Sequence, residues 1–237
     1  MPTYVYAITD ADHPLRLDGI AGVGDPAAEL RTVRTEQLSA VVSDAPADLR
    51  AKRRDVLAHQ SVQERLLADG TALPMRFGLV GPDDDQVAAV LEEQRDAYTE
   101  RLKEIAGCLE FHLKVARDED DLLREIMAES VTVRRLNERT RHDPGAHHDR
   151  VALGELVSQE VHARQDRMCA EMVARLTPAT ERTSVADPTK SHFLNVSFLV
   201  RREKTAAFSE AVQQEAAQRG VAYTFRLNGP LPPYSFV

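Results

Sequence analysis

Three segments in the second half of the chain alternate apolar and polar residues with a period of two, and this pattern restricts the fold most strongly. Such alternation predicts β-strands with one buried face. The segments cover residues 109–115, 193–200 and 221–227. In the second, Phe193 and Leu199 add apolar groups to the other face, so we predict that this strand is central in a sheet. Apolar runs predict further strands near residues 4–8, 38–43, 73–80 and 181–186.

Segments with helical periodicity lie between the predicted strands. The run Asp83, Asp84 and Asp85 offers an N-cap oxygen and places negative charge at the positive end of a helix dipole. Gly107 is a suitable stop for the helical segment that follows this run. The periodic segments predict helices at residues 52–69, 83–106, 118–140, 151–176 and 205–219, with a loop at 139–150.

From residue 108 onward the predicted order is strand, helices, strand, strand, helix, strand. This order indicates a ferredoxin-like split β-α-β-β-α-β unit with an enlarged helical crossover. Two antiparallel helices in the crossover would return the chain in the wrong direction, so either they run end to end or residues 177–180 make an extra return. We predict an α+β protein with two domains, an N-terminal α+β domain at 1–107 and the ferredoxin-like domain at 108–227. A proline-rich apolar tail at 228–237 then docks on the body.

The composition argues against several classes of protein. A length of 237 residues suits one large domain or two small ones. The formal charge of −8 opposes nucleic-acid binding, which depends on clustered positive charge. No run approaches the ~20 apolar residues of a membrane span. Two cysteines, Cys108 and Cys169, are too few for a disulfide framework and indicate a reducing compartment. We therefore expect a soluble cytoplasmic protein.

A histidine-rich segment holds the best candidate metal ligands. His142, His147 and His148 lie within eight residues that also include two aspartates. The spacing of His142 and His147 occurs in zinc sites. No cysteine pair accompanies them, however, and Pro144-Gly145 signals a turn, so a solvated interhelical loop is the favoured interpretation.

No motif assigns a catalytic residue or a cofactor. Both cysteines fit the pattern of small buried hydrophobic residues. Most carboxylates stand at predicted helix starts or on solvated helix faces. Gly19, Gly22 and Gly24 lack the Lys and Ser/Thr of a phosphate-binding loop. No residue is therefore assigned a catalytic role, and we expect no enzyme and no cofactor, although the absence of a motif does not by itself exclude an enzyme.

Two segments are not explained by local structure alone. In residues 73–78, alternation places Phe77 on an apolar face and Arg76 on the other, where Arg76 either points to water or contacts a partner. The tail is apolar and stiffened by prolines, although chain ends are usually polar and frayed. Leaving its large side chains in water is costly, so we predict that it folds back on the body or binds another protein. Its candidate contact residues are Pro232, Pro233, Tyr234 and Phe236.

The chain reads YVYAI at residues 4–8, LPMRFG at 73–78 and NGPLPPYSF at 228–236. Together, in this order and at these positions, the three segments resemble the gas vesicle protein F/L family. The resemblance implies an accessory protein of gas vesicle assembly with two α+β domains. It also implies association with the hydrophobic wall subunit, either in nucleation or as a minor component of the inner, gas-facing side of the wall, and contacts with other accessory proteins. It brings no catalytic residues, and it does not include the histidine-rich segment.

Physical reasoning is compatible with that role and leaves two alternatives. An acidic partner with exposed sheet edges can cap an aggregation-prone subunit by β-augmentation while its charge keeps the complex dispersed. A ferredoxin-like unit can equally host an enzyme or small-ligand module, which predicts a polar pocket around Arg76 or His112. A metal-regulated adaptor would use His142, His147 and His148.

Overall fold

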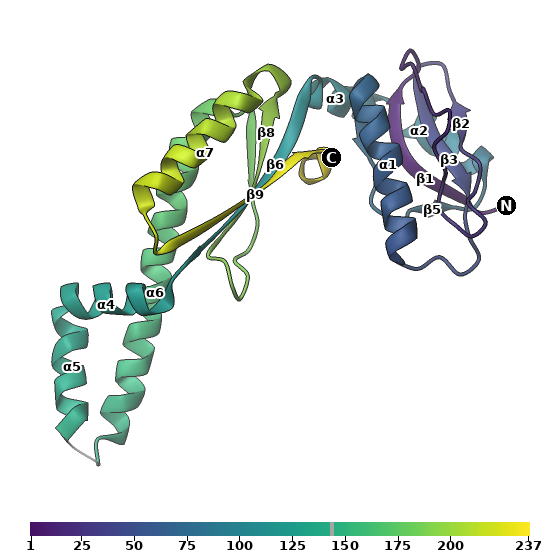
Figure 1. Ribbon diagram of the computed structural model, residues 1–237. Helices are drawn as coiled ribbons and strands as arrows, with labels where there is room; N and C mark the ends of the chain where they lie inside the picture. Colours follow the sequence, from purple (N-terminus) through teal and green to yellow (C-terminus); the bar gives the residue numbers. More distant parts are fainter. Residues whose placement is uncertain (143–144) are drawn as a thin grey trace. The chain divides into compact units, whose positions relative to one another are not determined.

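The computed structural model describes residues 1–142 and 145–237, apart from the side chain of His142. The chain divides into two compact units (Figure 1). Unit 1 contains Met1–Phe111 together with Gly229–Val237, and unit 2 contains His112–Asn228. Nearly half of the chain is helical and about a quarter is in strands, which confirms the α+β class. No helix in residues 1–142 or 145–237 is long and apolar enough to cross a bilayer.

Unit 1 is a sheet with helices on both faces. Its strands have the order β2-β3-β1-β4, and a fifth strand, β5, also pairs with β1. Helix α1 packs Val62 and Leu66 against Tyr4 and Tyr6 of β1. Helices α2 and α3 lie on the other face (Figure 1). The elements are β1 (Thr3–Asp10), β2 (Arg31–Arg34), β3 (Leu38–Asp44), α1 (Arg53–Asp69), β4 (Ala72–Pro74), β5 (Val80–Gly81), α2 (Asp84–Glu93) and α3 (Arg95–Ile105).

Two sequence predictions for unit 1 are wrong in detail. The predicted strand at residues 73–80 is two short strands, β4 and β5, separated by a loop in which Gly78 has a φ of +93°. The predicted helix at 83–106 is broken at Gln94, where the backbone leaves the helical region. The predicted N-cap is confirmed, since Asp83 Oδ1 accepts a hydrogen bond of 2.8 Å from Gln86 N.

The sheet of unit 2 has the strand order β7-β8-β6-β9. With helices after the first and third of its strands, this is the topology of a split β-α-β-β-α-β unit. The segment predicted to be central is β8, which lies between β7 and β6. The first strand of this sheet is β6 (Cys108–Arg117). The elements that follow its helical crossover are η1 (Thr177–Ala179), β7 (Arg182–Val185), β8 (Leu194–Arg201), η2 (Arg202–Lys204), α7 (Thr205–Arg219) and β9 (Tyr223–Leu231).

The crossover from β6 to β7 contains three helices, α4 (Glu119–Glu129), α5 (Val131–His142) and α6 (His147–Leu176). The predicted helix at 118–140 is therefore two helices, and most of the predicted loop at 139–150 is helical. Helices α5 and α6 form an antiparallel hairpin, so they do not run end to end (Figure 1). Because α5 leads away from the sheet, the 30-residue α6 alone makes the return to β7, and no extra return at 177–180 is needed.

Candidate functional site

The loop at residues 75–79 is held in place by a buried chain of hydrogen bonds. Gly78 N donates to the Tyr4 hydroxyl at 3.2 Å, and that hydroxyl lies 2.8 Å from His59 Nδ1. The other ring nitrogen of His59 lies 3.0 Å from the carbonyl oxygen of Met75. If His59 is neutral with its proton on Nε2, every donor and acceptor in this chain of hydrogen bonds has a partner. Burial accordingly lowers the pKa of His59 and raises the pKa of Tyr4.

The two candidate residues of this loop have different positions. Phe77 packs on the rings of His59 and Tyr4, with centroid distances of 5.7 and 6.0 Å, so it anchors the loop to the core. The side chain of Arg76 is exposed and pairs with no acidic residue that the structure describes. The alternation that predicted opposite faces for these two residues is therefore right, although the segment is a loop.

The tail lies against unit 1 through its last six residues. Pro232, Pro233 and Phe236 are buried, and Tyr234 is half-buried. The residues Tyr234–Phe236 form a 3₁₀ turn, η3. Burial raises the pKa of Tyr234 to about 12, with smaller contributions from nearby acidic groups.

A buried carboxylate fastens this turn. Glu110 of β6 accepts hydrogen bonds from Ser235 N at 2.8 Å and from Ser235 Oγ at 2.7 Å. Arg101 of α3 donates to the carbonyl oxygen of Phe236 at 3.2 Å. Sequence reasoning missed Glu110, because alternation assigned it to the polar face of its strand. No signal in the sequence identifies its partner 125 positions away.

An apolar groove lies where the loop, the tail and helices α2 and α3 meet. It consists of two adjoining hollows of about 280 and 430 Å³ that share Met75, Leu79 and Tyr98. The second hollow is bordered by Arg76, Arg101 and Val237. Several apolar side chains of the groove are exposed by more than two fifths, namely Leu79, Val80, Val90 and Val237. The residues that line it include no acidic side chain, histidine or cysteine.

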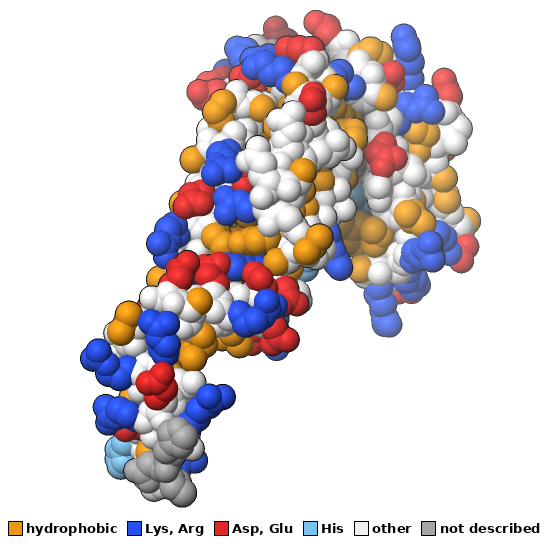
Figure 2. Space-filling model, turned by 60° about the vertical axis from the view of Figure 1, so that its left-hand side comes forward, with side chains coloured by type: hydrophobic (Ala, Val, Ile, Leu, Met, Phe, Trp, Pro, Cys, Tyr) orange, Lys and Arg blue, Asp and Glu red, His pale blue; other side chains and the backbone are white. Residues whose placement is uncertain are grey.

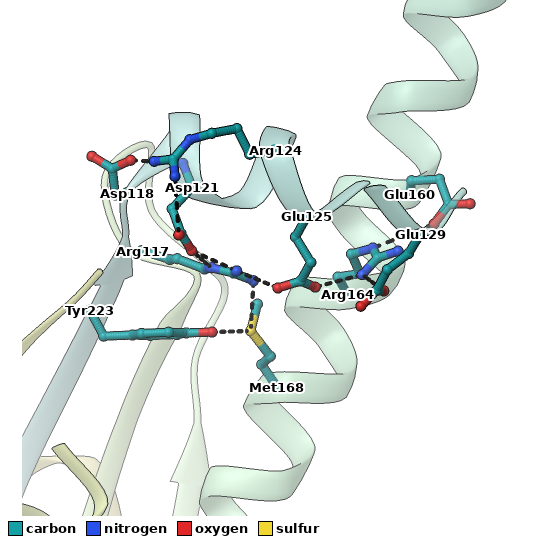
Figure 3. A network of polar contacts seen from close by, with 10 residues as sticks. All are labelled: Arg117, Asp118, Asp121, Arg124, Glu125, Glu129, Glu160, Arg164, Met168 and Tyr223. Carbon is teal, nitrogen blue, oxygen red and sulfur yellow. Dashed lines mark hydrogen bonds and ion pairs between the residues drawn. The ribbon is translucent and has the colours of Figure 1, made fainter. Parts of the chain in front are cut away.

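Unit 2 contains a network of ion pairs between β6, α4 and α6 (Figure 3). Arg117, with a side chain only 6% exposed, donates two hydrogen bonds to Asp121 Oδ2, at 2.7 and 3.0 Å, and another to Glu125. Arg164 donates to Glu125 at 2.5 Å and to Glu129 at 2.7 Å. Arg117 holds the pKa of the Glu125 carboxylate below its usual range, so Glu125 remains charged between the two arginines.

Aromatic and sulfur contacts complete the network. The Arg117 guanidinium lies 5.2 Å from the ring centroid of Tyr223, whose hydroxyl donates to Met168 Sδ at 3.0 Å. These residues border a hollow of about 240 Å³. Because its central charges are already paired with one another, we interpret the network as the connection that fixes α4 and α6 on the sheet.

Of the three histidine candidates, the structure describes the side chains of His147 and His148. The rings of His147 and His148 lie 6.2 Å apart at the first turn of α6, and the neighbouring Asp149 pairs with Arg139 at 2.6 Å. No group of three or more potential ligands occurs among the described residues. The His142 side chain lies outside them. His112, the other candidate pocket residue, lies 2.6 Å from Asn195 Oδ1 and lines neither hollow of the groove.

Comparisons with known proteins place these features in a family. The family model "Gas vesicle synthesis protein GvpL/GvpF" matches residues 2–237. Gas vesicle protein F of Streptomyces sp. (strain CB03234) is 38% identical, with all of both chains covered. Gas vesicle protein L of the same organism is 27% identical over 98% of this chain and 91% of its own length.

Solved structures share the fold. The crystal structure of the gas vesicle protein GvpF from Anabaena sp. PCC7120 matches with a TM-score of 0.86 and 21% identity, covering 99% of this chain and 97% of that one. The GvpF structure from Microcystis aeruginosa matches with a TM-score of 0.81 and 22% identity, covering 99% and 98%. The fold and the groove describe an α+β protein with a surface suited to binding. The chain belongs to the gas vesicle GvpL/GvpF family, and its role is that of a gas vesicle accessory protein.

Proposed function

We propose that this protein binds the hydrophobic wall subunit during gas vesicle assembly, and that the apolar groove of unit 1 is the contact surface. The observation that carries the proposal is the cluster of exposed apolar side chains in the groove, since such clusters mark interaction sites in soluble proteins. The groove places four residues of the family segment 73–78, Leu73 to Arg76, beside the last residue of the tail. Local structure alone did not explain the residues of either segment.

The chemistry of the groove favours binding over catalysis. General acid–base or nucleophilic catalysis needs a titratable or nucleophilic side chain beside the reacting atoms. Tyr98 is the one side chain of this kind in the groove, which is lined mainly by aliphatic side chains, with Gln86 and two arginines. No carboxylate, histidine or cysteine lines the groove beside Tyr98. Apolar segments of a wall subunit would bury against the aliphatic part. The arginines would contact its polar or acidic flanks.

Two further parts of the proposal rest on the family. We place the protein in the cytoplasm in association with the vesicle, at nucleation or on the inner side of the wall. Other accessory proteins of the vesicle are its further partners. The net charge of −8 would keep a complex with an apolar subunit dispersed.

Co-purification of the full chain with the wall subunit tests the proposal. We expect the wild type to retain the subunit and Leu79→Asp to lose most of it, because the substitution places a charge in the apolar groove. Leu57→Asp on α1 is the matched control, since Leu57 is also exposed (49%) but lies on the opposite side of the sheet. Thermal unfolding of each variant establishes that it is folded. Equal retention by Leu79→Asp and the wild type would refute the groove as the contact, and no retention by folded wild type would refute the binding itself.

A further inference from the structure

Helix α5 in unit 2 carries positive charge on an acidic chain. It forms a helical arm with the first half of α6, and the arm comprises residues 131–142 and 147–161. Helix α5 contains four arginines and one acidic residue, Glu138, whereas the whole chain has a formal charge of −8. Figure 2 shows Lys and Arg side chains along this part of the molecule. The positive charge is therefore a local property of α5, since residues 131–161 as a whole contain five arginines and five acidic residues.

Three of the four arginines of α5 form no ion pair with any residue that the structure describes. The folding of the arm depends on an apolar cluster in which Val133 is fully buried with Leu122 and Ile126 of α4. Arg135 and Arg141 are exposed and have no ion-pair partner among the residues that the structure describes. Arg134 donates only to the backbone carbonyl of Ala128. Among the residues that the structure describes, Arg139 is the one α5 arginine in an ion pair, with Asp149 of α6.

The spacing of these arginines matches a helical ligand. Arg134 and Arg141 are seven residues apart, about two turns or roughly 10 Å along the helix axis. Arg135 and Arg139 are four residues apart and therefore lie on one stripe. We propose that the exposed face of α5 binds an acidic α-helical segment of a partner protein, whose carboxylates are spaced by one turn.

The surroundings of the arm favour a short acidic helix over a long polyanion. Helix α4, which packs at the base of the arm, begins with the exposed acidic residues Asp118, Glu119 and Asp120. Nucleic acid extending beyond the arm would meet this negative charge, whereas a short helix ends before it. Val133 of α5 is buried with Leu122 and Ile126 of α4, and this packing fixes α5 in place, so the binding face is preorganised.

Fluorescence anisotropy with a labelled peptide of Glu-Ala-Ala-Ala repeats tests the proposal on the full chain. We expect binding at low ionic strength that weakens toward about 0.15 M salt, because exposed charges are screened. Arg135→Glu combined with Arg141→Glu should weaken binding at least about tenfold, since the two substitutions replace attraction with repulsion. Neither side chain contributes to the apolar cluster, so the variant should remain folded, which circular dichroism checks.

The matched control is Arg53→Glu combined with Arg65→Glu on α1, where both arginines are exposed and form no ion pair that the structure describes. It makes the same change in net charge and should leave the affinity within about twofold. Equal loss in both double variants would overturn the proposal, because it would show a net-charge effect only. Tighter binding of duplex DNA than of the peptide would also overturn it. These readouts do not involve the wall subunit, so they are independent of the proposed function.

Discussion

Single buried polar residues determine how the candidate site is built. Tyr4 and His59 satisfy the backbone of the loop that carries Arg76, and Glu110 satisfies the backbone and hydroxyl of Ser235 in the tail. A buried polar group without a partner costs ~1–3 kcal/mol, so each of these contacts selects one arrangement of the segment that it holds. The sequence indicates the exposure of Arg76, but it contains no signal for the role of Glu110.

Acidification should destabilise unit 1 through its buried histidines. Burial lowers the pKa of His59 and His13 from 6.5, so the unfolded chain binds more protons as the pH falls below that value. The stabilisation is complete above pH 6.5, is lost as the pH falls toward the folded pKa values, and levels off below them. Urea unfolding at pH values between about 5 and 7 should show a free energy of unfolding that rises with pH.

Substitution identifies the source of that slope. His59→Gln should flatten it and leave the part that His13 contributes. A free energy of unfolding that is constant or falls with rising pH over this range would contradict the prediction.

The positions at which helices begin and end depend on contacts with neighbouring elements as well as on the sequence of the helix itself. The acidic run at Asp83 predicts a helix start, and the structure has one there. Residues 118–140 were assigned to one helix, so the break between α4 and α5 at Ser130 was not predicted. The antiparallel hairpin of α5 and α6 was one of the arrangements left open. It forms because α5 and α6 bury a common apolar cluster with α4, in which Leu153 and Leu156 face Val133.

Among the tail residues, Phe236 should contribute most to the free energy of unfolding. Phe236 is 4% exposed, and its replacement by Ala should lower the free energy of unfolding by about 3–5 kcal/mol. Its neighbour Val237 is 43% exposed, so Val237→Ala should change the free energy by less than about 0.5 kcal/mol. Urea denaturation measures both. Small, equal effects would show that the tail is not packed on unit 1 in solution.

Each of the two units carries a different kind of surface. Unit 1 has the apolar groove, and unit 2 has the positively charged helix α5. A protein that brings an apolar subunit together with an acidic partner requires both kinds of surface. This arrangement supports an accessory role in assembly.

Complementation in a vesicle-forming cell that lacks the gene tests that role in the complete system. A chain that stops after Leu227 should fail to restore vesicles, partly because the loss of Phe236 destabilises unit 1. Arg76→Ala should reduce vesicle number while changing the free energy of unfolding by less than about 0.5 kcal/mol, because Arg76 is exposed. Arg53→Ala is the control for an exposed arginine outside the groove. Vesicles are counted by electron microscopy, and full restoration by the truncated chain would show that the tail is dispensable.

The amino-acid sequence alone determined the α+β class, the central position of β8, the start of α2 and the opposite orientations of Arg76 and Phe77. These features depend on periodicity, capping and side-chain polarity, which act within one element. Tertiary structure decided the division of residues 73–80, the helical hairpin, the burial of Glu110 and the groove itself. Each of these depends on contacts between residues far apart in the chain, such as Tyr4 with Gly78 and Glu110 with Ser235, and local patterns do not encode such pairings.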